Sequence, residues 1–309
     1  MTSSIFPRKD TILIVVIFTT IILVGTPISF IIWFNYDVNY GFGEIVIRKD
    51  QDFVNRYDFP GSGTINDPYL ITDYNIDTNK EVAILIEETT KYFLITNCTI
   101  ICPLDGILIS FVSEGTARIE NNEIQTTTNT YFVESLIKVI WAPGSQIINN
   151  QLSHLSSIYD TYGIYVASSK NSLIANNSCN SLGIGIYVLD SVSALIEYNF
   201  VENCQSGISI NSCDNSVTRY NRLYFNYYTG VYVGWSLSCA FHHNNFLNNS
   251  EAAFYDYQAY DRETNIWYEI STNEGNYWSD LVWDDDAIYI IGGHGQNIDL
   301  YPLQFPVAI

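Results

Sequence analysis

A short pattern that recurs about every 22 residues constrains the fold of this chain more than any other feature of its sequence. Each copy is a glycine followed by an alternation of apolar and other residues. Four copies begin at Gly163, Gly185, Gly207 and Gly230, so that successive starts are 22, 22 and 23 residues apart. Gly106 begins a similar segment. A fixed period of this length is typical of a solenoid, in which each repeat contacts only its neighbours.

Asparagine forms a second marker with the same period. The marker residues are Asn97, Asn122, Asn150, Asn177, Asn199, Asn221 and Asn244, at intervals of 25, 28, 27, 22, 22 and 23 residues. Asparagine tolerates the left-handed backbone conformation of a sharp turn, and its amide can bond to the asparagine of the next repeat. We therefore predict a ladder of stacked asparagines. The longer early intervals predict insertions near 126–130 and 153–159, where loops could border a binding groove.

The two markers predict the fold. The units are too short for a helical hairpin, and their apolar residues alternate with the period of two that strands require. We predict an all-β protein, a right-handed single-stranded parallel β-helix of about eight coils of ~22–28 residues over 60–254, with successive coils ~4.8 Å apart. A linker and N-terminal cap (35–59) and a Trp/Tyr-rich C-terminal cap (255–309) would flank it. The predicted interior contains Ile107, Ile109, Ile164, Val166, Ile186, Val188, Ile208, Ile210, Val231 and Val233.

An uncharged apolar segment precedes these repeats. It covers residues 11–34, and a helix of that length, about 36 Å, would cross a ~30 Å hydrocarbon core. Arg8 and Lys9 stand before it, so the positive-inside rule places 1–10 in the cytoplasm and the rest outside. We predict a single-pass transmembrane signal anchor with an extracellular or periplasmic C-terminal domain. The alternative is a cleaved signal peptide, which would make the protein secreted.

Charge and cysteine content narrow the classes of protein. The formal net charge of −20 argues against nucleic-acid binding, which needs lysine and arginine to displace counterions. The repeat register places the six cysteines in the interior, as buried thiols rather than disulfides. Asn-x-Ser/Thr sequons make Asn97, Asn176 and Asn248 candidate glycosylation sites in an exported chain.

Segments that flank the repeats carry a family resemblance. They are Gly61-Ser-Gly-Thr-Ile-Asn-Asp-Pro-Tyr-Leu-Ile71, Gly275-Asn-Tyr-Trp-Ser-Asp280 and Asp299-Leu-Tyr-Pro-Leu303. With them, residues 55–303 resemble the NosD-like family of right-handed parallel β-helix (PbH1) repeat proteins, which is similar to carbohydrate-binding (CASH-type) β-helices and includes archaeal and bacterial surface proteins. The resemblance implies a β-helix. The family's closing Asp/Gly-rich loop is reduced here to Asp284, Asp285 and Asp286, which leaves them as candidate calcium ligands.

The resemblance also implies a role in copper delivery, because the family takes its name from a copper-accessory protein of nitrous oxide reductase maturation. Soft copper sites use clustered Cys, Met and His, whereas the four histidines of this chain are scattered. His242 and His243, beside the marker Asn244, are the candidate copper ligands. Two ordinary surface histidines are the alternative.

A column of tyrosines suggests a different ligand. Tyr165, Tyr187 and Tyr232 hold one outward slot on three coils, and Ser209 interrupts them. Exposed aromatic rings can stack on sugar rings, which would make carbohydrate or a cell-envelope glycan the partner, but they also pack against loops. The Trp/Tyr-rich C-terminal cap could cover the column, and both interpretations stay open.

Catalysis is the remaining question. Polysaccharide lyases and epimerases need a base beside acidic residues. Candidate bases include Arg219 and Arg222, but no two stacked coils place carboxylates in one slot near a base. We therefore predict a membrane-anchored, non-catalytic binding or structural module for carbohydrate, with calcium as the one candidate cofactor. The alternatives are a carbohydrate-active lyase, epimerase or hydrolase and a NosD-like copper-accessory protein.

Overall fold

A computed structural model describes residues 12–18, 30–36, 44–126, 134–155, 161–250, 257–284 and 286–309. The chain divides into two compact units, Met1–Gly41 and Phe42–Ile309. In the first unit, β1 (Ile12–Phe18) pairs with β2 (Phe30–Tyr36) as an antiparallel hairpin.

The helix predicted over 11–34 is not confirmed, because both described segments in this range are strands. They are rich in isoleucine, valine and phenylalanine, which favour strands wherever two such segments can pair. Hydropathy, on which the prediction relied, does not distinguish a paired apolar strand from an apolar helix. Among the residues that the structure describes, no helix combines the length and the apolar character needed to span a membrane.

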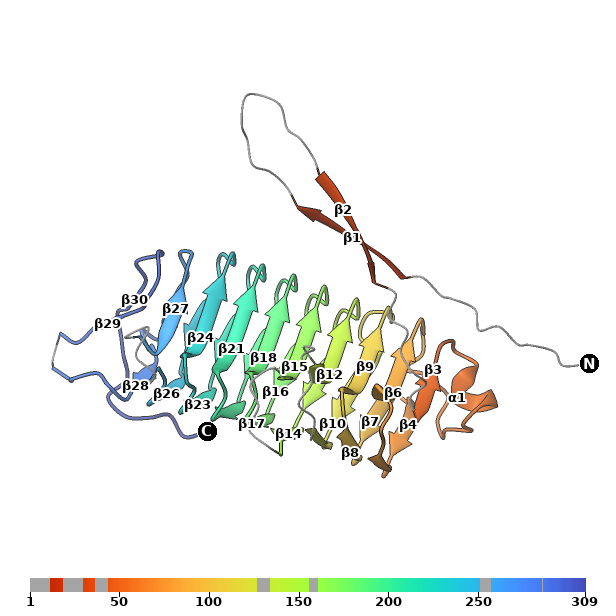
Figure 1. Ribbon diagram of the computed structural model, residues 1–309. Helices are drawn as coiled ribbons and strands as arrows, with labels where there is room; N and C mark the ends of the chain where they lie inside the picture. Colours follow the sequence, from red (N-terminus) through yellow and green to blue (C-terminus); the bar gives the residue numbers. More distant parts are fainter. Residues whose placement is uncertain are drawn as a thin grey trace, which may run out of the picture. The chain divides into compact units, whose positions relative to one another are not determined.

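The second unit is a parallel β-helix of the right-handed type, which confirms the predicted class of fold (Figure 1). Its chain winds repeatedly through three parallel sheets. The first contains β3 (Ile45–Ile47), β6 (Val82–Glu87), β9 (Asp105–Ser110), β12 (Glu134–Ile140), β15 (Thr161–Ala167), β18 (Ile184–Leu189), β21 (Ser206–Asn211), β24 (Thr229–Gly234) and β27 (Ala259–Asp261).

The other two sheets follow the same order. The second contains β4 (Tyr69–Thr72), β7 (Phe93–Thr96), β10 (Ala117–Glu120), β13 (Gln146–Ile148), β16 (Leu173–Ala175), β19 (Leu195–Glu197), β22 (Val217–Arg219) and β25 (Ala240–His242). The third contains β5 (Asn75–Asp77), β8 (Thr99–Cys102), β11 (Glu123–Thr126), β14 (Gln151–His154), β17 (Ser178–Asn180), β20 (Phe200–Glu202), β23 (Arg222–Tyr224), β26 (Asn245–Leu247) and β28 (Tyr277–Trp278). Within the described residues, seven regular turns run from β6 to β26, and β3, α1 (Asp52–Asn55), β4 and β5 precede them.

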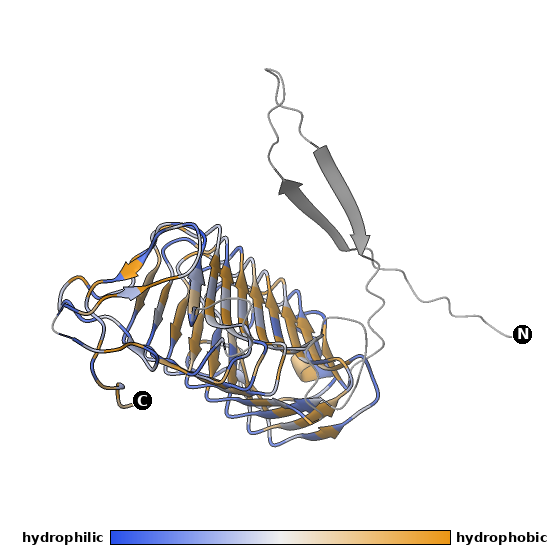
Figure 2. Ribbon diagram, turned by 60° about the vertical axis from the view of Figure 1, so that its left-hand side comes forward, coloured by the Kyte–Doolittle hydropathy of each residue, from blue (hydrophilic) through white to orange (hydrophobic). Residues whose placement is uncertain are grey.

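Stacked aliphatic side chains fill the interior. All ten predicted interior residues are fully buried, and Ile186 pairs directly with Ile164 and Ile208 on the neighbouring coils. The alternation of apolar and polar residues is visible along the strands in Figure 2. The repeated glycine allows close stacking, since a Cβ on Gly207 would lie 2.4 Å from the Gly230 carbonyl oxygen.

Buried asparagines form a hydrogen-bonded ladder beside the strands of the second sheet. The Nδ2 of Asn122, Asn150, Asn177, Asn199 and Asn221 each donates to the Oδ1 of the next asparagine at 2.9–3.0 Å, ending on Asn244. The prediction must be corrected at Asn97, which is exposed, because Cys98 occupies the ladder slot and donates its N–H to Asn122. The left-handed conformation was expected at the ladder asparagines themselves. It is adopted instead by the residue before each of them, such as Asn176 or Tyr198.

The C-terminal segment closes the end of the solenoid and explains the two closing motifs. The ladder continues from Asn244 to Asn276. The backbone N–H of Asn276 donates to the Asp299 carboxylate at 2.7 Å, and the ladder ends there. Trp278 donates its indole N–H to Asp299 and stacks on the core ring of Phe246. Gly275 is needed because a Cβ there would lie 1.9 Å from Asp299 Oδ1. Beyond β28, β29 (Tyr289–Ile290) and β30 (Ile298–Asp299) form a short hairpin.

The cysteines confirm the predicted register. All six are free and buried, and Cys179 lies in one interior column with Val201 and Leu223. Burial raises the pKa of the Cys204 and Cys213 thiols to about 12, so both stay protonated at neutral pH and are poor metal ligands.

Candidate functional site

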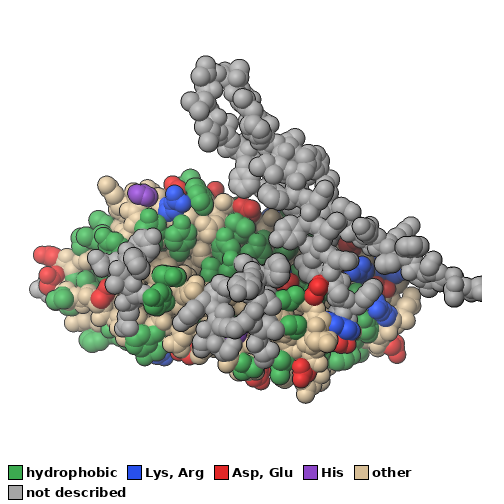
Figure 3. Space-filling model, viewed as in Figure 1, with side chains coloured by type: hydrophobic (Ala, Val, Ile, Leu, Met, Phe, Trp, Pro, Cys, Tyr) green, Lys and Arg blue, Asp and Glu red, His purple; other side chains and the backbone are tan. Residues whose placement is uncertain are grey.

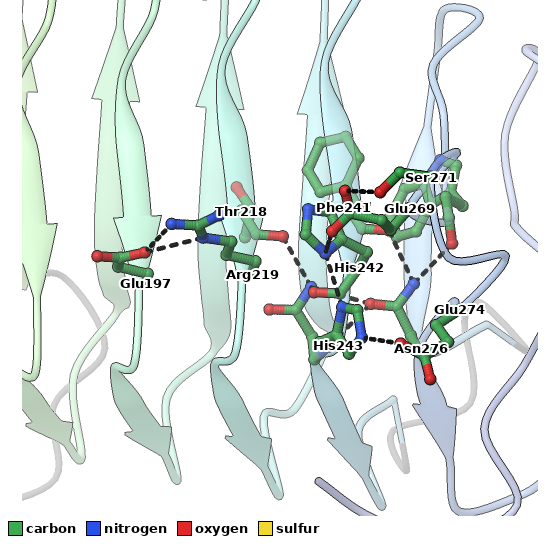
Figure 4. Close-up of polar contacts among 12 residues, drawn as sticks. Glu197, Thr218, Arg219, Phe241, His242, His243, Glu269, Ser271, Glu274 and Asn276 are labelled. Carbon is green, nitrogen blue, oxygen red and sulfur yellow. Dashed lines mark hydrogen bonds and ion pairs between the residues drawn. The ribbon is translucent and has the colours of Figure 1, made fainter.

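Two adjacent histidines and two glutamates meet near the C-terminal end of the solenoid (Figure 4). His242 is the last residue of β25, and His243 occupies the left-handed turn position before Asn244, with φ of 56°. The His242 and His243 Nδ1 atoms are 2.8 Å apart. Glu269 and Glu274 come from the C-terminal segment, with Glu269 Oε2 3.5 Å from His242 Nδ1 and Glu274 Oε2 3.0 Å from His243 Nε2.

Burial sets the protonation of this cluster. Both histidines are buried, and desolvation lowers the pKa of His242, so its imidazole is neutral at pH 7. The hydrogen bond from His243 lowers the pKa of Glu274, which keeps that carboxylate ionised. One of the two Nδ1 atoms must therefore carry the proton of the bond between them, and the other accepts it.

Neighbouring residues hold the two imidazoles in place and leave one side of the cluster open. Tyr220 stacks on the His243 ring, with centroids 4.8 Å apart, and Tyr198 stacks on Tyr220 in turn. Arg219 lies directly opposite His242 on the preceding coil. Its guanidinium forms an ion pair with Glu197, with 2.8 Å between Nη2 and Oε2. An open depression of about 440 Å³ adjoins His242 and Glu269 and is bordered by Tyr268 and Ser271.

The donor set fits a divalent metal ion. The ligand atoms of His242, His243 and Glu269 all lie within 4.8 Å of one another. Metal–imidazole bonds of about 2.0–2.1 Å that meet at a right angle place their nitrogens about 2.8–3.0 Å apart, which matches the observed Nδ1–Nδ1 separation of 2.8 Å. Glu274, on the far nitrogen of His243, is placed like the carboxylate partner of a metal-bound histidine and would leave Nδ1 for the ion.

Sequence reasoning identified the two histidines but not the two glutamates. Glu269 lies 26 residues and Glu274 lies 31 residues after His243, in a segment without the repeat pattern, so no spacing rule pointed to them. His154 is buried on β14, and His294 is exposed and lies outside the cluster. Asp284 and Asp286 are exposed, and Asp284 accepts the backbone N–H of Asp286, whereas Asp285 lies outside the described residues.

The tyrosine column occupies the outward face of the first sheet. Tyr165, Tyr187, Ser209, Tyr232 and Tyr260 follow one another in register. The four rings are half-buried, and burial raises the pKa of Tyr165 and of Tyr187 to about 12. Hydrophobic side chains gather in patches on the face of the molecule that Figure 3 shows. The described part of the C-terminal cap extends the column through Tyr260, while Trp267 and Trp278 are buried at the solenoid end.

The candidate bases of the catalytic alternative interact with carboxylates or aromatic rings of the solenoid. Arg219 binds Glu197, and Lys138 binds the buried Asp105 at 3.2 Å. Arg222 lies over the rings of Phe200 and Tyr224. Among the described residues, none of these cations forms ion pairs with two carboxylates, the arrangement that a lyase would need.

The predicted glycosylation sites share one feature. Asn97, Asn176 and Asn248 are all exposed and all adopt a positive φ at turns. Their side chains are therefore accessible, and their modification stays a prediction.

Together, the fold and this cluster define a parallel β-helix protein with a candidate histidine–carboxylate metal site. The sequence model of one family, described as periplasmic copper-binding protein (NosD), matches residues 71–282. This chain belongs to the NosD family. No curated protein matches it.

Among solved structures, the chain is similar to the Dettilon tailspike protein (gp208), with 15% identity and a TM-score of 0.44. The match covers 67% of this chain and 53% of the tailspike chain. This chain thus spans about half the length of that protein.

Proposed function

We propose that this chain is an exported copper-binding protein whose ligands are His242, His243 and Glu269. The observation that carries the proposal is the 2.8 Å separation of the two Nδ1 atoms, with a carboxylate oxygen 3.5 Å from one of them. Nitrogen and oxygen donors bind Cu²⁺ more tightly than the other divalent first-row ions. The family description, periplasmic copper-binding protein, supports the same metal and a location outside the cytoplasm.

The donor atoms favour copper(II) over copper(I). Copper(I) prefers thiolate and thioether ligands. The single methionine is residue 1, and the six cysteines are buried in the solenoid. A copper(II) ion bound to both Nδ1 atoms would require the proton between them to move to the far nitrogen of its ring, and binding should weaken in acid, where the imidazoles become protonated.

Calorimetric titration of the purified full-length chain with Cu²⁺ tests this proposal. We expect one tight site in the wild type and a loss of affinity of about 100-fold or more in His242→Ala and His243→Ala. Glu274→Gln should cost about 10–100-fold, the usual effect of removing the partner of a metal-bound histidine. His294→Ala is the matched control and should bind as the wild type does. Equal affinity in the wild type and both histidine variants would refute the proposed ligands.

Carbohydrate binding along the tyrosine column is the second candidate function. It is favoured by the partial exposure of Tyr165, Tyr187 and Tyr232 on one flat sheet, because aromatic faces of this kind can stack on sugar rings. Changing all three residues to alanine should abolish binding to a cognate glycan with little loss of thermal stability. A melting temperature lowered by several degrees with unchanged glycan binding would instead assign the column to packing.

The uncharged residues 11–34, preceded by Arg8 and Lys9, support export and attachment to a membrane by the N-terminal segment. Protease added outside intact cells should then digest residues beyond Asn35, while a tag before Arg8 stays protected. A protected C-terminal domain would contradict export.

A further inference from the structure

The last two tyrosines of the column border a recess that the predicted column did not include. The rings of Tyr232 on β24 and Tyr260 on β27 are almost parallel, with an interplanar angle of 2° and 5.6 Å between their centroids. A recess of about 210 Å³ lies beside them and is also lined by Ser206, Tyr228, Thr229, Tyr257 and Arg262. Its size falls below the range typical of drug-sized ligands, so it suits one small ring rather than an enclosed larger molecule.

Arg262 gives the recess a positive charge. It is the only lysine or arginine after Arg222, and its guanidinium carbon lies 4.5 Å from the centre of the Trp235 ring. No carboxylate of the described residues forms an ion pair with it, and the neighbouring Asp261 is turned inward to Asn265 and Trp267. The guanidinium can therefore bind a ligand carboxylate, for which its planar fork is well suited.

Trp235 lies beside Arg262 at this corner of the solenoid. It has φ of 47° and is 60% exposed, and a bulky residue in this conformation is unfavourable. The same turn position on earlier coils is held by Phe111, Trp141, Ser168, Asp190 and Ser212, and the first two are also exposed aromatic residues. The contact between the Trp235 ring and the Arg262 guanidinium orients this cation at the edge of the recess.

We propose that this recess binds a pyranose ring that carries a carboxylate, as in a polymer of uronic acids. The proposal rests on the proposed carbohydrate-binding function and names its ligand class. The tyrosine faces supply stacking surfaces for the ring, and Arg262 is the partner of the carboxylate. Because the chain as a whole carries a net charge of −20, distant charges repel such a ligand, and the single cation at the recess determines where its acidic group binds.

Binding of acidic oligosaccharides to the full-length chain tests the proposal. The probes are oligomers of galacturonate, guluronate and glucuronate, each compared with the same oligomer after its carboxylates are reduced to alcohols. Salt near 0.15 M screens the long-range repulsion. We expect the acidic form of one oligomer to bind at least about tenfold more tightly than its reduced form, the scale of a hydrogen bond to a charged group.

Two variants and a control locate the effect. Arg262→Gln should remove the preference for the acidic form and leave binding of the reduced form unchanged. Tyr260→Ala should weaken both forms, whereas Tyr74→Ala, at an exposed tyrosine near the other end of the solenoid, should weaken neither. Melting curves verify that each variant is folded. Equal binding of acidic and reduced oligomers by the wild type would overturn this inference and leave carbohydrate binding standing. No binding to any oligomer would overturn both.

Discussion

The asparagine ladder makes a quantitative prediction at Asn177. Its Oδ1 accepts the backbone N–H of Asn150 at 2.9 Å and the Asn150 amide at 3.0 Å, and its Nδ2 donates to Asn199 Oδ1 at 3.0 Å. Alanine has no polar side-chain atom that could replace these bonds. Asn177→Ala would leave the buried Asn150 N–H without a partner, at a cost of about 1–3 kcal/mol, and would lose further bonds worth about 1 kcal/mol each. We expect a total loss of about 3–5 kcal/mol in the free energy of unfolding.

Urea denaturation of the full-length chain measures this loss as a lower transition midpoint with an unchanged slope. The matched control is Asn176→Ser, one residue earlier, where the asparagine is exposed and serine is acceptable in the left-handed turn, as at Ser168. That variant should stay within about 0.5 kcal/mol of the wild type. If the two variants were equally stable, the ladder would not contribute to the fold as described.

Three further changes test the core and the C-terminal cap. Ile186→Asp places a carboxylate among fully buried aliphatic residues and should prevent folding, as judged by circular dichroism, because a lone buried charge costs several kcal/mol. Gly275→Ala forces a Cβ against Asp299 and should lower the free energy of unfolding by about 1–3 kcal/mol. Burial raises the pKa of Asp299 from 3.8 to about 6, so the free energy of unfolding should fall as the pH rises across this window. Denaturation at several pH values should show a flatter decline for Asp299→Asn.

The fold could be predicted because the repeat imposes the same packing on each coil. The alternation in Gly185-Ile-Tyr-Val places Ile186 inside, and neighbouring copies stack on it in the same register. The misplacement of Asn97 has a physical origin, since the ladder residue follows the buried isoleucine by three positions and Cys98 holds that position. The apolar N-terminal segment was ambiguous because hydropathy alone does not decide between a helix and paired strands.

The candidate metal site could be predicted only in part. His242 and His243 lie in the repeat, where the register determines their positions. Glu269 and Glu274 lie in the closing segment, which folds back over β25 without a repeat, so their approach depends on tertiary contacts. For the same reason the sequence did not place Arg262 beside Tyr232 and Tyr260.

The electron paramagnetic resonance spectrum of the full-length chain with one equivalent of Cu²⁺ tests the copper proposal most directly. Each coordinated imidazole nitrogen splits the copper signal. The account predicts a spectrum of two nitrogen ligands for the wild type and for His294→Ala, and of one nitrogen ligand for His243→Ala. A two-nitrogen spectrum that persists when both His242 and His243 are replaced would contradict the proposed site.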